Sequence, residues 1–126
     1  MFVVVYVLPK QYADIFEYLA KKIKIKKEID LLKKGFTNYY EPEYFFSRAI
    51  KYNDGYDVSF SISVSKKTMK VKEVSIIDEN FGQPHFCDKI AFDQVVNYLK
   101  DLIKKEAIEE IDWKDIEKRK IKQFGQ

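Results

Sequence analysis

His85 and Cys87 carry the most reactive side chains of this sequence, and they lie two residues apart, just before Asp88. With Asp78 and Glu79 upstream, the stretch holds groups that could bind a metal or act as nucleophile and base. A structural zinc site, however, needs about four ligands, and these are the only histidine and the only cysteine of the chain. Catalytic dyads usually come from separate elements beside an oxyanion hole, for which the sequence offers no candidate. We therefore expect a loop with a buried cysteine, no catalytic residue, no metal and no cofactor.

A run of lysines between residues 21 and 34 is the second candidate for chemistry. The run holds seven lysines, and its centre is formed by Lys21, Lys22, Lys24, Lys26 and Lys27. Lysines this close together could bind the phosphate backbone of a nucleic acid. Against this, the net charge is only +3 and the only arginines are Arg48 and Arg119, whereas arginine is the usual side chain for bidentate recognition of phosphate or guanine. The competing interpretation is a solvated helix face.

Aromatic side chains form the third candidate. A dense cluster consists of Tyr39, Tyr40, Tyr44, Phe45 and Phe46, and the only tryptophan is Trp113. Most of these rings should pack in the core, but exposed aromatics often anchor a protein interface. We predict that a partner contacts Tyr39, Tyr40, Tyr44 and Trp113.

The composition indicates one folded unit. Residues 1–126 suffice for a single globular domain, and hydrophobic residues make up 46% and aromatic residues 16% of the chain. The single cysteine fits a reducing compartment. The apolar run at residues 1–8 is too short to span a membrane, so we expect a cytoplasmic protein without membrane contact.

The clearest element is a strand at residues 56–64. Four apolar residues alternate there with four serines, namely Val58, Phe60, Ile62 and Val64 with Ser59, Ser61, Ser63 and Ser65. Successive side chains of a strand point to opposite faces, so this strand has one apolar and one hydroxyl face. We expect a central strand whose serine face is open.

Before this strand, Phe2–Leu8 is predicted to form a buried strand, followed by a helix from Pro9 that ends at Gly35. The apolar stripe of that helix rotates between Lys22 and Lys27, so a break or a change of buried face is expected there. Residues 37–43 are predicted to be a connector. The aromatic residues of Tyr44–Tyr52 favour a strand, although several would also share a helical face.

The remainder of the chain completes a three-stranded meander and adds helices. The Asp54-Gly55 pair predicts a hairpin, and a change of apolar parity near Lys72 and Glu73 predicts a β-bulge. Residues 78–88 are predicted to be a loop. Helices are expected around residues 92–103 and from Trp113 to about residue 122.

These elements predict an α+β fold, with an antiparallel sheet of about four strands and two to three helices mainly on one face. Our leading hypothesis for function is a small non-enzymatic protein that docks on a macromolecule, with another protein as the favoured partner, in an inhibitor, immunity-type or adaptor role. The alternative is a nucleic-acid-binding protein that uses the lysines at 21–27. A small enzyme centred on His85 and Cys87 is the third hypothesis.

Overall fold

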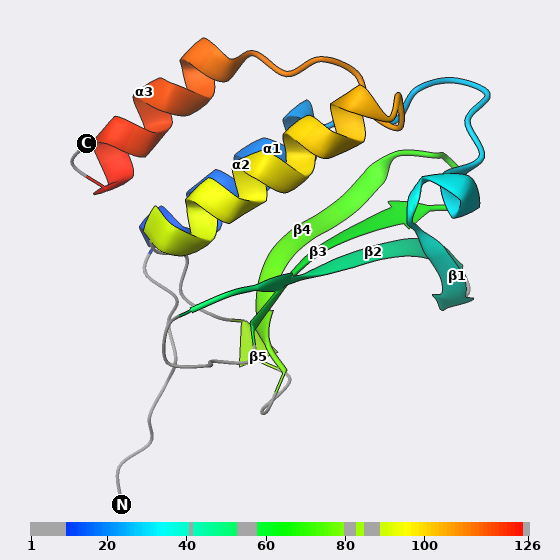
Figure 1. The fold of residues 1–126 in the computed structure, drawn as a ribbon, viewed down its shortest axis with the longest axis horizontal. Coiled ribbons are helices and arrows are strands. Elements are labelled where there is room, and N and C mark those ends of the chain that lie inside the picture. The colour runs from blue at the N-terminus through cyan, green and yellow to red at the C-terminus, as the bar shows by residue number, and fades with distance from the viewer. Residues whose placement is uncertain (1–9, 41, 53–57, 80–82, 85–88, 125–126) are drawn as a thin grey trace, which may run out of the picture.

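The fold is described from a computed structural model over residues 10–40, 42–52, 58–79, 83–84 and 89–124. In chain order the elements are α1 (Lys10–Lys22), the short 3-10 helix η1 (Leu31–Lys34), β1 (Thr37–Tyr40), β2 (Glu43–Ile50), β3 (Val58–Ser65), β4 (Val71–Asp78), β5 (Gln83–Pro84), α2 (Lys89–Lys104) and α3 (Trp113–Phe124). The strands form one antiparallel sheet in the order β1-β2-β3-β4-β5. Figure 1 shows α1 and α2 along one face of this sheet, with α3 on their far side. The predicted α+β architecture is therefore confirmed, while the strand predicted at Phe2–Leu8 lies outside the described residues.

β3 is the central strand of the sheet, and its two faces differ in composition. Its apolar side chains face the helices and are almost completely buried, with Phe60, Ile62 and Val64 each 0% exposed. The prediction of an open serine face is wrong at two positions, since Ser61 and Ser63 are only 2% and 7% exposed. Ser63 lies between the longer cross-strand neighbours Phe45 and Glu73, which shield its short side chain, whereas Ser61 lies between Ser47 and Ser75, whose size does not explain its burial.

The meander has the predicted irregularity. Ser63 pairs with Glu73 and Val64 pairs with Val71, which leaves Lys72 as the extra residue of a bulge. Most of the segment predicted as a strand at Tyr44–Tyr52 forms β2 rather than a helix, although the strand ends at Ile50. The Asp54-Gly55 turn lies outside the described residues, but Ile50 pairs with Val58 across it, as in a hairpin.

The predicted break in the first helix is confirmed. α1 ends at Lys22, and the next residues are extended, with Ile25 in an isolated β-bridge to Ile108. The apolar stripe rotates there because its period changes from that of a helix to that of a strand. The chain then turns into η1, which is capped by Asp30 and by Gly35 in a left-handed conformation.

Two short strands were not expected. β1 occupies part of the predicted connector at 37–43, and β5 occupies part of the predicted loop at 78–88. Both are edge additions that pair with a stronger neighbour, β1 with β2 and β5 with β4. Strands this short contain too few residues to show a clear alternation of apolar and polar side chains. Their strand conformation depends on hydrogen bonds to the neighbouring strand, which the local sequence does not reveal.

The C-terminal helix is held by a few specific contacts. Asp112 caps α3 through its side chain, which accepts hydrogen bonds from the backbone amides of Lys114 and Asp115. Ile116 is 1% exposed, and the hydroxyl of Tyr18 in α1 donates a hydrogen bond to the Asp115 carboxylate. Burial, together with this hydrogen bond, raises the pKa of the Tyr18 phenol. α3 is therefore fastened to α1 although its sequence has little apolar content.

Candidate docking groove

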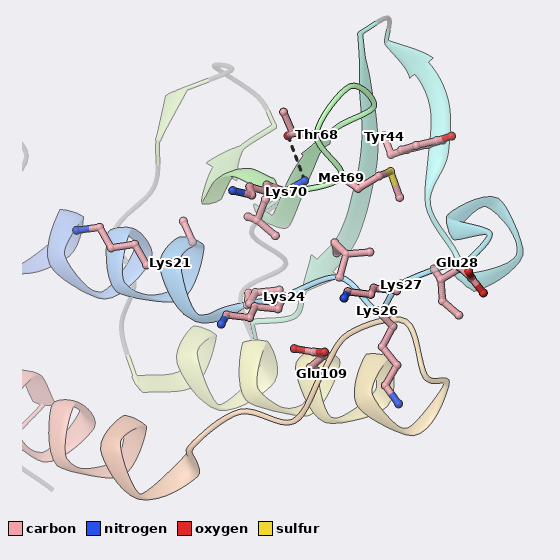
Figure 2. A pocket seen from close by; sticks show the side chains of 15 residues that line it. Lys21, Lys24, Lys26, Lys27, Glu28, Tyr44, Thr68, Met69, Lys70 and Glu109 are labelled. Atoms are coloured by element: carbon pink, nitrogen blue, oxygen red, sulfur yellow. Dashed lines mark hydrogen bonds between the residues drawn. The ribbon is translucent and has the colours of Figure 1, made fainter.

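A groove of about 920 Å³ opens between the end of α1, the extended segment that follows it and the turn between β3 and β4. We call it the lysine groove. Its lining residues are Ala20, Lys21, Ile23, Lys24, Ile25, Lys26, Lys27, Glu28, Ile29, Tyr44, Thr68, Met69, Lys70, Val71 and Glu109 (Figure 2). The volume lies in the range typical of ligand sites, about 300–1,000 Å³.

One wall is a basic segment fixed by backbone hydrogen bonds. The amide of Lys26 donates to the carbonyl of Ala107 at 3.1 Å, and the amide of Glu109 donates to the carbonyl of Lys24 at 2.8 Å. These bonds join two stretches that are more than 80 residues apart in the sequence. Both bonds close the same long loop, so its entropic cost arises once. They fix the backbone at Lys24 and Lys26, from which these two lysine side chains extend.

The opposite wall is the β3–β4 turn. Met69 donates its backbone amide to the carbonyl of Ser65 at 2.8 Å and has a φ of 55°. A non-glycine residue in this left-handed region is uncommon and costs about 1 kcal/mol or more. Glu28, on the basic segment, also has a positive φ of 60°. Two of the three non-glycine residues with positive φ in the described part of the chain, Glu28 and Met69, thus line the lysine groove.

The charge of the groove is unbalanced. Five lysines line it against two glutamates, Glu28 and Glu109. Within the described part of the chain, none of those five ammonium groups takes part in a hydrogen bond or ion pair. Lys72, outside the groove, behaves differently, since it lies 2.6 Å from the Glu43 carboxylate and its pKa is raised by that hydrogen bond. The groove lysines therefore remain available to an anionic ligand.

Part of the groove lining is apolar. Ile25, Ile29, Met69 and Val71 are partly buried and pack against the core. The ring of Tyr44 closes one end, with the Lys66 ammonium 5.3 Å from its centroid. The arrangement can therefore bind a ligand that carries both negative charge and an apolar group.

The structure brings together most of the lysines predicted from the sequence. Lys21, Lys24, Lys26 and Lys27 all line the groove, but Lys22 does not, and its ammonium lies 5.8 Å from the centroid of the Tyr18 ring. In Figure 2 the Lys26 side chain points away from the β3–β4 turn. The predicted basic patch is thus a groove wall with one member turned outward and another outside it.

The predicted aromatic residues come from three elements, β1, β2 and α3. Tyr44 lines the groove, while Tyr39 lies on the edge strand β1 and is 82% exposed. Tyr40 is also in β1, and its side-chain position lies outside what the structure describes. Trp113 begins α3, packs partly buried against the core and has the Lys100 ammonium 5.4 Å from its ring centroid. Tyr39 and Tyr44 therefore lie on paired strands, whereas Trp113 lies on a separate helix.

Sequence reasoning missed Lys70, Met69 and Glu109 as members of the site. Lys70 adjoins the short polar turn at residues 66–68, and a hairpin turn with a neighbouring lysine is a weak indication of a binding wall. Nothing in the sequence places Glu109 beside Lys24, because their contact depends on the tertiary fold.

The enzyme hypothesis receives no test, since His85 and Cys87 lie outside the described residues. Across the ranges that the structure does describe, no group of three or more histidine, cysteine, aspartate or glutamate side chains could hold a metal ion. No helix in those same ranges has the length and hydropathy needed to cross a membrane.

Comparisons with known proteins add no relative. No protein-family model matches the chain, and neither the curated proteins nor the solved structures contain a match.

Proposed function

We propose that this chain is a non-enzymatic docking protein that binds another protein through the lysine groove, in an inhibitor, immunity-type or adaptor role. The single observation that carries the proposal is the groove itself, whose lining combines apolar side chains with five lysines that have no ion-pair partner among the described residues, two of them on a segment fixed by backbone hydrogen bonds. Protein interfaces combine such apolar centres with charged rims that steer the partner. The lone Cys87 supports a cytoplasmic location as part of the same proposal.

The positive φ angles of Glu28 and Met69 support the proposal independently. Strained backbone persists where the surrounding structure enforces it, and it clusters at binding sites. At Met69 the strain places an apolar side chain on the groove wall. A glycine in the same turn would relieve the strain but would remove this side chain.

Nucleic-acid binding is the second candidate, favoured by the closeness of Lys21, Lys24 and Lys27 along one wall. In this case each lysine that contacts a phosphate would add about 0.7–0.9 to the slope of log affinity against log salt. A protein partner held by a few charges and an apolar anchor gives a shallower dependence.

Affinity capture from the native host, with and without nuclease, tests the proposal. The bait proteins are the wild type, a Lys24→Glu/Lys70→Glu variant and a Lys67→Glu control, whose lysine is exposed in the same turn but does not line the groove. We expect one protein to be retained after nuclease treatment by the wild type and the control, and lost with the groove variant. Retention that disappears with nuclease favours the nucleic-acid candidate, and retention unchanged by the groove variant contradicts both.

A further inference from the structure

The two ends of the lysine groove differ in chemistry. In Figure 2 the side chains of Lys21, Lys24 and Lys70 lie toward one end, and those of Tyr44 and Met69 lie toward the other. Lys21 belongs to α1 and Lys24 to the segment after it, whereas Tyr44 belongs to β2; the β3–β4 turn contributes to both ends, with Lys70 at the cationic end and Met69 at the other. A ligand that fits both ends must itself be polarised.

The apolar end is suited to a side chain of variable shape. Met69 is unbranched and polarisable, so its thioether can adapt to different apolar or aromatic groups. Val71 and Ile29 line the same groove and are partly buried against the core, so they add apolar surface to the lining. An apolar residue of a partner could bury its surface there without a change in the backbone of this chain.

The two glutamates of the wall distinguish between classes of ligand. Glu28 and Glu109 line the same groove as the lysines. A nucleic-acid strand carries a negative charge at every nucleotide, so a strand that follows the groove would bring phosphates near these carboxylates. A peptide can place its carboxylates only opposite the lysines and can present backbone amides or neutral side chains to the glutamates. The lining also has a single aromatic ring, Tyr44, where single-stranded nucleic-acid sites usually use several stacking platforms.

The cationic end is preorganised. Lys21 lies in α1, the carbonyl of Lys24 accepts a hydrogen bond from the amide of Glu109, and the carbonyl of Lys70 accepts one from the amide of Ser65, so the backbone that carries these lysines does not need to order on binding. Preorganisation of this kind reduces the entropic cost of association. Lysine presents a point charge rather than a planar fork, and it therefore accepts single carboxylates in several geometries.

We propose, on the basis of the docking function above, that the lysine groove binds an extended acidic peptide segment of the partner with one large apolar residue beside the acidic run. Its carboxylates lie at the end formed by Lys21, Lys24 and Lys70, and its apolar residue lies against Met69 and Tyr44. Charge complementarity selects the segment, and the apolar contact fixes its direction along the groove.

Fluorescence anisotropy with labelled peptides tests the assignment on the full chain. The main probe is a short peptide of alternating aspartate and glutamate followed by leucine and phenylalanine. In one matched probe the carboxylates are replaced by amides, and in another the leucine and phenylalanine are replaced by serine. Oligothymidylate and a DNA duplex provide the nucleic-acid arms. We expect only the acidic peptide with its apolar residues to bind well, because both ends of the groove are then occupied.

Variants of the chain locate the binding. Lys24 and Lys70 are exposed, so a Lys24→Gln/Lys70→Gln variant should fold, which circular dichroism checks. Loss of these two charge contacts should raise the Kd of the main probe about tenfold. A matched Lys67→Gln control should leave the Kd within about twofold, since an exposed charge outside the groove contributes little.

Three results would overturn the inference: equal binding of the amide probe, tighter binding of either nucleic acid than of the main probe, or no binding of the main probe at all. This failure is distinguishable from failure of the docking function. If the groove variant still abolishes capture of a host protein while the acidic peptide does not bind, docking stands and the acidic-segment assignment is wrong.

Discussion

Gly35 is the position where a single added methyl group tests the packing around the sheet most directly. It ends η1 with a φ of 98°, and a Cβ built on it would lie 2.5 Å from Nη2 of Arg48. Arg48 is held in place by a hydrogen bond from Nη1 to the carbonyl of Ser47 at 2.8 Å and lies 4.3 Å above the ring centroid of Phe46. Gly35→Ala therefore meets two separate obstacles, one in the backbone and one in the arginine.

The magnitude of the effect is a sum of two contributions. An L-residue in the left-handed region costs about 1–2 kcal/mol. The guanidinium can swing aside, but that movement weakens its hydrogen bond and its contact with Phe46, which together are worth about 0.5–1 kcal/mol at a half-exposed site. We expect Gly35→Ala to lower the free energy of unfolding by about 2 kcal/mol.

Urea denaturation followed by circular dichroism measures this loss, provided that the m-value stays constant. A double-mutant cycle with Arg48→Ala separates the contributions, because in that background only the backbone cost of about 1–2 kcal/mol remains. A loss below about 0.5 kcal/mol would refute the assigned conformation of Gly35. An equal loss in both backgrounds would refute the role of Arg48.

Two further predictions concern the contacts that join the ends of the chain. Lys26→Pro removes the backbone N–H that donates to the carbonyl of Ala107, a residue that is 0% exposed. It should lower the free energy of unfolding by about 1–3 kcal/mol relative to Lys26→Ala, because a buried carbonyl then lacks its hydrogen bond. Equal stability of the two variants in urea would contradict the hydrogen bond between Lys26 and Ala107. The pKa of Tyr18 is raised, so the phenol stays protonated in the folded chain at a pH where the unfolded chain has released the proton. Its contribution to stability is complete below the unfolded pKa of about 10 and is lost as the pH rises through the folded value. Above that pH, the melting temperature should therefore decrease more steeply with pH for the wild type than for Tyr18→Phe. Parallel plots of melting temperature against pH would contradict the contact with Asp115.

Elements with a strong internal period could be predicted from the sequence. The alternation from Val58 to Val64 gives the central strand, and the change of parity near Lys72 gives the bulge, because both depend on neighbours along the chain. The break after Lys22 was detectable for the same reason, as lysines entered an apolar stripe.

The features that escaped prediction depend on partners far along the chain. β1 is a strand because β2 offers it hydrogen bonds, and β5 pairs with β4 in the same way. The basic segment was predicted to be partly helical, whereas its pairing with residues 107–109 keeps it extended. The lysines of the candidate site were therefore identified as residues, but the groove that they line with Lys70 and Glu109 could not be derived from their spacing.

The lysine groove has a thermodynamic consequence because its lining residues come from four distant parts of the chain, around positions 20–29, 44, 68–71 and 109. An unfolded chain does not assemble this groove, so a molecule that binds there binds the native state alone. Binding and folding are then linked equilibria, and a ligand at about a hundred times its Kd adds about 2.7 kcal/mol to the stability of the whole domain. A shift in melting temperature therefore reports occupancy of the lysine groove without a labelled partner. Candidate ligands can be ranked by the increase in melting temperature that each produces at the same concentration.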